Sequence, residues 1–164
     1  METAVQVSVV IPAYNEEEAI VNVIREVKKA MGSTSYYYEI LIVDDNSTDS
    51  TFEKARTEGV RVLRRVRRGG SGASRRSGIE AAAGEIIVML DADGSYDASD
   101  IPKLLEHFPD YDQVNGARTS EQGTLKFLRM PTKWLIRQLA CYLTSTHIPD
   151  LNTGLKAFKK DIMK

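Results

Sequence analysis

The pattern of apolar and polar residues predicts strands and helices in alternation. Apolar, β-branched runs bounded by turn residues predict five short strands, at residues 5–11, 39–43, 60–63, 85–90 and 113–116. Between the first two runs, apolar residues recur at helical spacing over residues 20–31. Asn15, with Glu18 three residues later, predicts a capping box at the start of that helix.

Three further helices are expected to begin near Ser50, within residues 71–74 and within residues 97–99. Gly59 fits the position after a helix where a positive φ is needed. The alternation predicts an α/β fold with a mainly parallel, twisted central sheet and helices on both faces, because right-handed helical crossovers join parallel strands.

The pattern changes after Arg118. Residues 124–146 are helix-like and mix Trp, Phe and Leu with Lys and Arg, and Pro131 must break or kink this helix. Core packing explains the apolar residues. A helix pair lying on a membrane surface is the alternative.

Length and composition narrow the class of protein. A chain of 164 residues that is 42% hydrophobic is long enough for one globular domain and too apolar to be disordered. The single cysteine, Cys141, excludes an internal disulfide and favours a reducing compartment. The longest aliphatic run, residues 86–90, is far shorter than the ~20 residues of a membrane-spanning helix. No signal-peptide pattern precedes Val5.

The formal net charge of −1 conceals an uneven distribution of charge. Seven of the 22 basic residues are arginines within residues 61–76, a segment that contains no acid. Such a segment is either a solvated basic face or a surface for phosphate, anionic lipid or nucleic acid. A nucleic-acid-binding module is disfavoured because the segment contains no aromatic residue on which a base could stack.

Polar and acidic residues follow three predicted strands, within residues 12–17, 44–49 and 91–97. Because ligands of open α/β sheets bind at the carboxyl ends of parallel strands, we expect these segments to line one rim. Asp91 and Asp93 aim two carboxylates at one point, where a hard divalent cation would bind and keep substrate phosphates as further ligands. Turn chemistry, which also selects Asp and Gly after strands, is the alternative explanation.

The other two segments could hold a nucleoside. Tyr14 offers a flat ring for a base, and Asp44 and Asp45 could accept hydrogen bonds from a ribose or a base edge. A helix-capping loop is the alternative for residues 44–49. A glycine-rich dinucleotide turn is excluded because residues 12–16 contain no glycine, and a P-loop is excluded because the glycines after the third strand lack the Gly-Lys-Ser/Thr ending.

Taken together, these motifs resemble the family 2 glycosyltransferases of GT-A fold, and among them the dolichyl-phosphate mannose and polyprenyl-phosphate glucose synthases. The matching segments are VVIPAYNEE at 9–17, VDDNSTD at 43–49, Gly72-Ala73 with Gly78, DAD at 91–93, GAR at 116–118 and DLNTGLK at 150–156. The resemblance implies a GT-A-like, Rossmann-type sandwich. It also implies inverting transfer of a sugar from a GDP-mannose or UDP-glucose type donor to a polyprenyl or dolichyl phosphate.

The resemblance further implies roles for individual residues, with Mg²⁺ or Mn²⁺ as the cofactor. It implies that Pro12, Tyr14 and Glu16 hold the nucleoside, that Val43 and Asp45 contact its base, and that Asp91 and Ala92 face the ribose and diphosphate. Asp93 would be the main metal ligand, together with Asp91. Arg118 would contact a donor or acceptor phosphate, Asp150 would act as a base or orient the acceptor, and Arg129 would hold the acceptor phosphate. Asp93, Asp150 and Arg118 form the expected catalytic set. Two positions depart from the family pattern: Arg68-Gly69-Gly70-Ser71-Gly72 replaces an Asn-x-Gly-Lys-Gly-like loop, and Ser95 stands where some synthases have Gln.

Members of the resembled family continue past residues 150–156, so we expect residues 1–164 to be a single GT-A domain truncated at its C-terminal end. An anionic membrane surface would attract the arginine segment. The expected protein is therefore cytoplasmic, peripherally associated with the cytoplasmic membrane face, and has no nucleic-acid partner. The alternative function is a haloacid-dehalogenase-type phosphatase, in which Asp91 of the Asp-Ala-Asp-Gly-Ser loop would be the nucleophile.

Overall fold

The chain divides into two compact units, residues 1–116 with 154–164 and residues 117–153. The computed structural model describes residues 4–116 and 153–163, which include nearly all of the first unit. The strands of this unit are β1 Val7–Ala13, β2 Tyr38–Asp44, β3 Arg61–Arg64, β4 Ile86–Met89, β5 Gln113–Asn115 and β6 Lys156–Lys159. Its helices are α1 Ile20–Met31, α2 Thr51–Thr57, α3 Gly70–Ala81 and α4 Ile101–Leu105, with short 3₁₀ turns at Ala98–Asp100 and Lys160–Met163.

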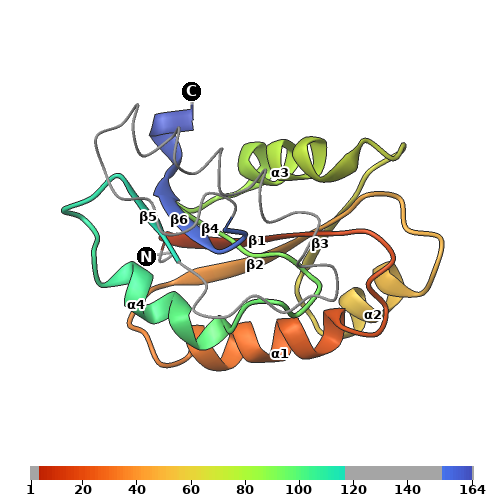
Figure 1. Ribbon diagram of the computed structural model, residues 1–164, viewed down its shortest axis with the longest axis horizontal. Coiled ribbons are helices and arrows are strands. Elements are labelled where there is room, and N and C mark those ends of the chain that lie inside the picture. The colour runs from red at the N-terminus through yellow and green to blue at the C-terminus, as the bar shows by residue number, and fades with distance from the viewer. Residues whose placement is uncertain (1–3, 117–152, 164) are drawn as a thin grey trace, which may run out of the picture. The chain divides into compact units, whose positions relative to one another are not determined.

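The strands form one six-stranded sheet in the order β3-β2-β1-β4-β6-β5 (Figure 1). β3, β2, β1 and β4 are parallel, so their carboxyl ends lie at the same edge of the sheet. β6 runs antiparallel to both β4 and β5 and lies between them. The predicted α/β fold with a mainly parallel sheet is confirmed.

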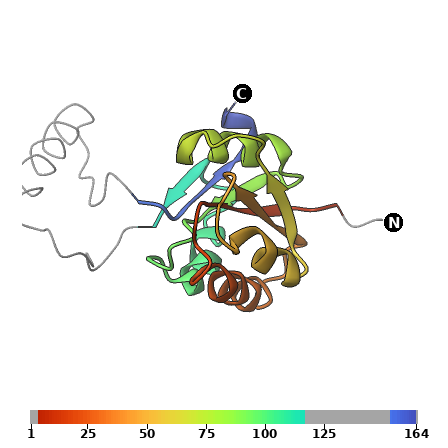
Figure 2. The same cartoon turned by 90° about the vertical axis from the view of Figure 1, so that its right-hand side faces the viewer.

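Helices cover both faces of the sheet, with α3 on one face and α1, α2 and α4 on the other (Figures 1 and 2). Val9 and Ile11 of β1 belong to the core that includes the apolar side of α1. Val10, between them, belongs to the smaller core on the side of α3. Both faces of β1 are therefore buried, which explains why its sequence is a continuous apolar run instead of an alternating one.

The predicted capping box at Asn15 and Glu18 is wrong. Helix α1 begins at Ile20, and its N-cap residue Ala19 makes no side-chain cap hydrogen bond. Asn15 has a φ of 55°, and its side-chain oxygen accepts a hydrogen bond from the backbone N–H of Thr48 at 2.9 Å. Asn15 therefore joins the loop after β1 to the loop after β2 and does not cap the helix.

Two other local predictions are confirmed. Gly59, directly after α2, has a φ of 67°. Asp97 precedes a short 3₁₀ turn that leads into α4, and its carboxylate accepts a hydrogen bond from the backbone N–H of Ser99 at 2.8 Å.

The helix expected within residues 124–146, including Pro131, lies outside the described residues. Within residues 4–116 and 153–163, no helix combines the length and the apolar character needed to cross a membrane.

Packing of α3 against the sheet generates a stability prediction. A methyl group on the buried Gly78 would collide with Val10 and lie 3.0 Å from Val43 Cγ2. We predict that Gly78→Ala lowers the free energy of unfolding by about 1–3 kcal/mol, the usual cost of overpacking, as measured by urea denaturation.

Gly72→Ala is the matched control in the same helix, because a methyl group at Gly72 meets no atom within 4 Å. This substitution should leave stability unchanged or raise it by roughly 0.5–1 kcal/mol, since glycine disfavours a helix interior. Equal effects of the two substitutions would contradict the close packing of α3 on β1.

Candidate functional site

The loops after β1, β2 and β4 meet the N-terminal end of α3 at the carboxyl edge of the parallel strands. Together they line a pocket of about 300 Å³. This is the edge at which open α/β sheets bind ligands. Its lining residues are Pro12, Ala13, Tyr14, Glu16, Asp45, Arg68, Gly70, Ser71, Ser74, Arg75, Asp91, Ala92 and Asp93.

Most of the predicted binding residues come together in this pocket. Those that line it are Pro12, Tyr14, Glu16, Asp45, Asp91, Ala92 and Asp93. Val43 does not line it, because its side chain is fully buried in the core beside α3. Arg118, Arg129 and Asp150 lie outside the described residues.

Asp45 is the most constrained acid of the pocket, with only 3% of its surface exposed. Its carboxylate accepts hydrogen bonds from Arg65 Nη1 at 2.5 Å, from the Gly69 N–H at 3.0 Å and from the Gly70 N–H at 2.7 Å. Burial alone would raise the pKa of Asp45, but the hydrogen bonds from Gly69, Gly70 and Arg65, together with the nearby Ser74 hydroxyl, outweigh it and lower the pKa below its ordinary value. An ionised carboxylate therefore fixes the N-terminal end of α3, where backbone N–H groups favour negative charge.

Ser74 lies beside this carboxylate in the first turns of α3. Its side chain is buried at 1% exposure, and its hydroxyl lowers the pKa of Asp45. The geometry nevertheless falls short of a hydrogen bond, and the Ser74 hydroxyl has no partner of good geometry among the residues described. The Ser74 hydroxyl therefore acts on Asp45 through its dipole and not through a hydrogen bond.

Asp44 has a structural position, in contrast to its predicted role as an acceptor for a ribose or base. It is fully buried, accepts hydrogen bonds from the Ser47 N–H at 3.3 Å and forms an ion pair with Arg64 at 3.3 Å. The N-cap residue of α2, Ser50, makes no side-chain cap hydrogen bond, but Asp49 before it accepts from the N–H of Thr51, the first residue of the helix, at 2.9 Å. The helix-capping interpretation of this loop therefore holds for Asp49.

The loop after β2 also positions the loop after β1. The Thr51 hydroxyl accepts a hydrogen bond from the Glu16 N–H at 2.8 Å, and Asp49 accepts one from the Glu17 N–H at 3.3 Å. These contacts place the Glu16 side chain toward the acids that follow β4. Glu16 is half-buried, which raises its pKa, and the nearby charges of Asp93, Asp49 and Asp91 raise it further.

The two aspartates that follow β4 differ in their surroundings. Asp91 Oδ1 forms an ion pair with Arg75 Nη2 at 2.8 Å. Asp93 is exposed, and its Oδ1 accepts a hydrogen bond from the Ser95 N–H at 2.9 Å. Asp93 is therefore the carboxylate better placed to hold a cation, with Glu16 close enough for repulsion between the two charges. Within residues 4–116 and 153–163, no three acidic, His or Cys side chains are arranged to hold a metal ion by themselves. A divalent ion at Asp93 would therefore need further ligands, such as substrate phosphates.

Gly154 brings the backbone that leads into β6 close to the site. The Gly154 N–H donates a hydrogen bond to the Tyr96 hydroxyl. A side chain at Gly154 would collide with Asp91 Oδ2. Glycine is needed here because the backbone that leads into β6 approaches the Asp91 carboxylate so closely.

Most arginines of the segment 61–76 are paired with acidic side chains. Five of its seven arginines form ion pairs: Arg61 with Glu39, Arg64 with Asp44, Arg65 with Asp45, Arg75 with Asp91 and Arg76 with Glu80. These five arginines therefore have acidic partners within the protein, and the choice between a solvated basic face and an anion-binding surface stays a prediction. Arg68 and Arg75 also line the pocket, although no sequence motif predicts them there. The acids at the neighbouring strand ends, which need cationic partners, are the signal for them.

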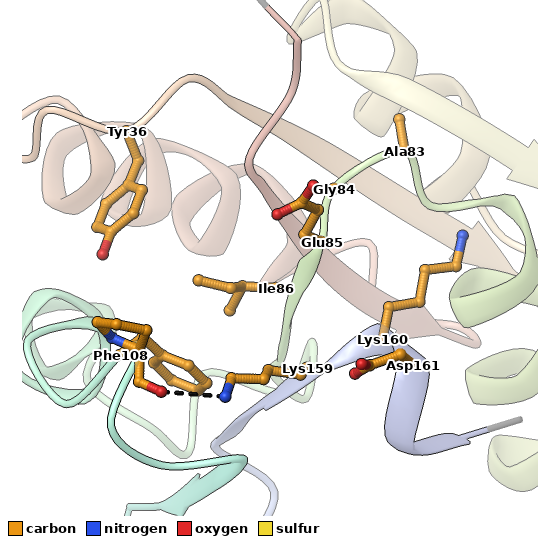
Figure 3. Close-up of a pocket in the computed structure, with 10 residues that line it drawn as sticks. Tyr36, Ala83, Gly84, Glu85, Ile86, Phe108, Lys159, Lys160 and Asp161 are labelled. Carbon is orange, nitrogen blue, oxygen red and sulfur yellow. Dashed lines mark hydrogen bonds between the residues drawn. The ribbon is translucent and has the colours of Figure 1, made fainter.

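A larger cavity of about 710 Å³ lies at the opposite edge of the sheet, near the start of β4 and the end of β6 (Figure 3). None of the predicted site residues that the structure describes lines it. Lys159 Nζ donates to the Pro109 carbonyl at 3.0 Å, and Lys160 Nζ donates to the Ala82 carbonyl at 2.5 Å. We assign the site to the smaller pocket because convergent acids and a perturbed pKa are the better indicators of chemistry.

Two sequence relatives have names that identify them as enzymes of polyprenyl phosphates. The chain is 31% identical over 169 residues to the dodecaprenyl-phosphate galacturonate synthase of Rhizobium johnstonii, and the match covers 98% of this chain and 50% of the relative. It is 32% identical over 164 residues to the undecaprenyl-phosphate 4-deoxy-4-formamido-L-arabinose transferase of Aeromonas hydrophila, covering 96% of this chain and 50% of the relative. The chain therefore spans about half the length of these relatives.

Solved structures share the fold. Mannosyl-3-phosphoglycerate synthase from Rubrobacter xylanophilus superimposes with a TM-score of 0.78 at 20% identity, over 96% of this chain and 54% of that one. Glucosyl-3-phosphoglycerate synthase from Mycobacterium tuberculosis, crystallised with Mn²⁺, UDP-glucose and phosphoglyceric acid, superimposes with a TM-score of 0.76 at 24% identity, over 96% of this chain and 57% of that one. These are glycosyltransferases of GT-A fold, and the expected GT-A-like fold is confirmed.

The sequence model of one family covers almost the whole chain. It is described as "Glycosyl transferase family 2" and matches residues 8–164, a range that contains every strand-end motif of the pocket. The chain belongs to glycosyl transferase family 2.

Proposed function

We propose that the pocket binds a nucleoside-diphosphate sugar with a divalent cation, and that the protein transfers the sugar to a polyprenyl phosphate. The observation that carries this proposal is the convergence of Glu16, Asp91 and Asp93 beside the ring of Tyr14 in one pocket. An aromatic face suits a base, and exposed carboxylates suit a metal that shares the diphosphate. The names of the sequence relatives support the acceptor class.

Each pocket residue takes the role that the family resemblance implied. Pro12, Tyr14 and Glu16 hold the nucleoside, and Asp45 lies at the base edge. Asp91 and Ala92 face the ribose and diphosphate, and Asp93 is the main ligand of Mg²⁺ or Mn²⁺. The UDP-glucose and Mn²⁺ bound in the mycobacterial neighbour support a UDP-linked donor and Mn²⁺, with a GDP-linked donor and Mg²⁺ as the alternatives.

In the proposed reaction, a phosphate oxygen of the acceptor attacks the anomeric carbon of the donor sugar. The bond between that carbon and the leaving phosphate oxygen breaks, the electron pair stays on the nucleoside diphosphate, and the anomeric centre inverts. A divalent ion held by Asp93 would supply Lewis-acid stabilisation of the leaving phosphate. Arg118 is proposed to add positive charge at the same phosphate.

The acceptor itself requires little base catalysis. A monophosphate has a second pKa of about 6, so its oxygens are largely ionised at neutral pH. We therefore assign Asp150 to orienting the acceptor and Arg129 to its phosphate. Asp91 as the nucleophile of a phosphatase has no support, because its carboxylate is paired with Arg75 and the chain belongs to family 2.

The acceptor class implies a membrane-bound substrate, so we propose peripheral association with the cytoplasmic membrane face. Val66 is 91% exposed between Arg65 and Arg67, on the loop that leads to α3. An exposed apolar side chain beside an exposed arginine suits the surface of an anionic bilayer. We expect the protein to float with anionic liposomes more than with neutral ones, and Val66→Ser with Arg67→Ser to lose the difference. Equal flotation of the unsubstituted protein with both kinds of liposome would contradict this location.

Nucleotide binding is tested by thermal unfolding with UDP or GDP, each with and without Mn²⁺. A ligand at about 100 times its Kd stabilises the folded state by about 2.7 kcal/mol. We expect one of the two nucleotides to raise Tm, and Mn²⁺ to increase the rise. Asp93→Asn should abolish the increase due to Mn²⁺ while keeping the rise due to nucleotide alone.

Asp110→Asn is the control for that substitution, because Asp110 is exposed and does not line the pocket. It should behave as the unsubstituted protein does. Loss of the Mn²⁺ effect in both variants, or in neither, would contradict the assignment of Asp93.

The raised pKa of Glu16 predicts a pH-dependent stability. Burial and the charges of Asp93, Asp49 and Asp91 disfavour its ionised form, so folding stability falls as pH rises from the ordinary pKa of 4.5 through the raised one. Glu16→Gln removes this cost and should raise Tm at pH 7 by about 1–2 °C, with no gain below pH 4.5.

Glu18→Gln, an exposed neighbour, serves as the control and should change Tm little. Added Mg²⁺ should narrow the gap between Glu16→Gln and the unsubstituted protein, because a bound cation offsets the same repulsion. A Tm for Glu16→Gln at pH 7 that is unchanged or lower would contradict the crowding of charge at this site.

A further inference from the structure

The guanidinium of Arg68 covers the ring of Tyr14 inside the candidate pocket. Arg68 Cζ lies 3.9 Å from the centroid of the ring. Both residues line the pocket, Tyr14 from the loop after β1 and Arg68 from the loop before α3. A cation over the face of a tyrosine ring is attracted to it at any distance below about 6 Å, but at an exposed site the attraction is weak.

Arg68 differs from the other arginines near the pocket because no described acidic side chain forms an ion pair with it. Arg65 is paired with Asp45 at 2.5 Å, and Arg75 is paired with Asp91 at 2.8 Å. Across residues 4–116 and 153–163, no acidic side chain forms an ion pair with Arg68. Its side chain is exposed. Arg68 can therefore exchange its contact with the protein for a contact with a ligand at small cost.

The backbone next to Arg68 is fixed even though its side chain is exposed. The N–H groups of Gly69 and Gly70, the two residues that follow, are bound to the Asp45 carboxylate at 3.0 and 2.7 Å. The side chain can thus change rotamer without moving the loop. The Arg68 side chain would move while the backbone next to it stays in place.

We propose that Arg68 covers Tyr14 in the free protein and moves onto the phosphates when a nucleoside diphosphate binds, leaving the ring face to the base. This inference rests on the proposed function. The ring face cannot hold the guanidinium and a base at once, so a base must displace Arg68. A phosphate gives the displaced guanidinium charge-assisted, bidentate hydrogen bonds that are stronger than its contact with the ring.

The charges around the pocket explain why such a residue is needed. Glu16, Asp91 and Asp93 repel a diphosphate, and Arg75, the other arginine among the described lining residues, is paired with Asp91. The loop of residues 69–72 contains no charged residue. Arg68 thus supplies the mobile positive charge for the diphosphate. It also makes the pocket favour a nucleoside diphosphate over the bare nucleoside, which displaces Arg68 without offering it a new partner.

Calorimetric titration of Arg68→Ala tests this exchange, with UDP against uridine and GDP against guanosine, all in Mg²⁺. For the nucleotide that the unsubstituted protein binds, Arg68→Ala should weaken diphosphate affinity about tenfold, the value of one charge-assisted hydrogen bond. The affinity for the matching nucleoside should stay the same or rise, because Tyr14 is no longer covered. Arg68→Lys, which keeps the charge, should recover a large part of the diphosphate affinity.

Arg67→Ala is the control, since Arg67 is an exposed neighbour that does not line the pocket, and it should leave both affinities unchanged. If Arg68→Ala weakens diphosphate and nucleoside equally, or changes neither, the exchange is overturned while the proposed function stands. If the unsubstituted protein binds neither UDP nor GDP, the proposed function fails, and this inference fails with it.

Discussion

The Asp45 carboxylate joins the end of β2 to the start of α3, and the candidate site is built around that junction. It receives hydrogen bonds from two backbone N–H groups of the loop before α3 and from Arg65. A buried carboxylate without these partners would be strongly destabilising. With them it fixes the glycines that follow Arg68. The position of Arg68 over Tyr14, and with it the shape of the pocket, depends on this carboxylate.

Pairing of charge across distant segments explains how an acidic rim and an arginine-rich segment coexist in a nearly neutral protein. Ion pairs join Asp45 to Arg65 and Asp91 to Arg75. The charge that stays unbalanced on this rim is concentrated at Glu16 and Asp93, where burial, and after it repulsion from Asp93, raises the pKa of Glu16. Unbalanced charge at the end of parallel strands is a reason to expect a ligand there. In the proposed function that ligand is a divalent cation shared with the phosphates of the donor.

The sequence predicts the parts of this structure that local patterns determine. The strands β1, β2 and β4 are long or continuous apolar runs because both of their faces are buried. The acids that follow these runs indicate where the carboxyl ends of the parallel strands lie. β6 was missed because Lys156–Lys159 is a four-residue strand with a lysine at each end, and only its neighbours β4 and β5 make it a strand.

Contacts between distant segments account for the remaining errors. Asn15 was expected to cap α1, yet its partner Thr48 lies 33 residues away. In the sequence the arginines form a segment without acids, because their acidic partners lie in other parts of the chain. Asp45, the partner of Arg65, is 20 residues away. The Val43 side chain points into the core, so the predicted contact of Val43 with the base, which stays a prediction, would involve its backbone.

The central claim is that a nucleoside diphosphate and a metal bind at the carboxyl edge of the sheet and not in the larger cavity of Figure 3. Titration of ¹⁵N-labelled protein with UDP or GDP and Mg²⁺, followed by amide chemical shifts, distinguishes the two places directly. The account predicts that the largest shifts occur at Tyr14, at residues 69–71 and at residues 91–94. Shifts concentrated at residues 83–86 and 159–161, with the rim unchanged, would contradict it.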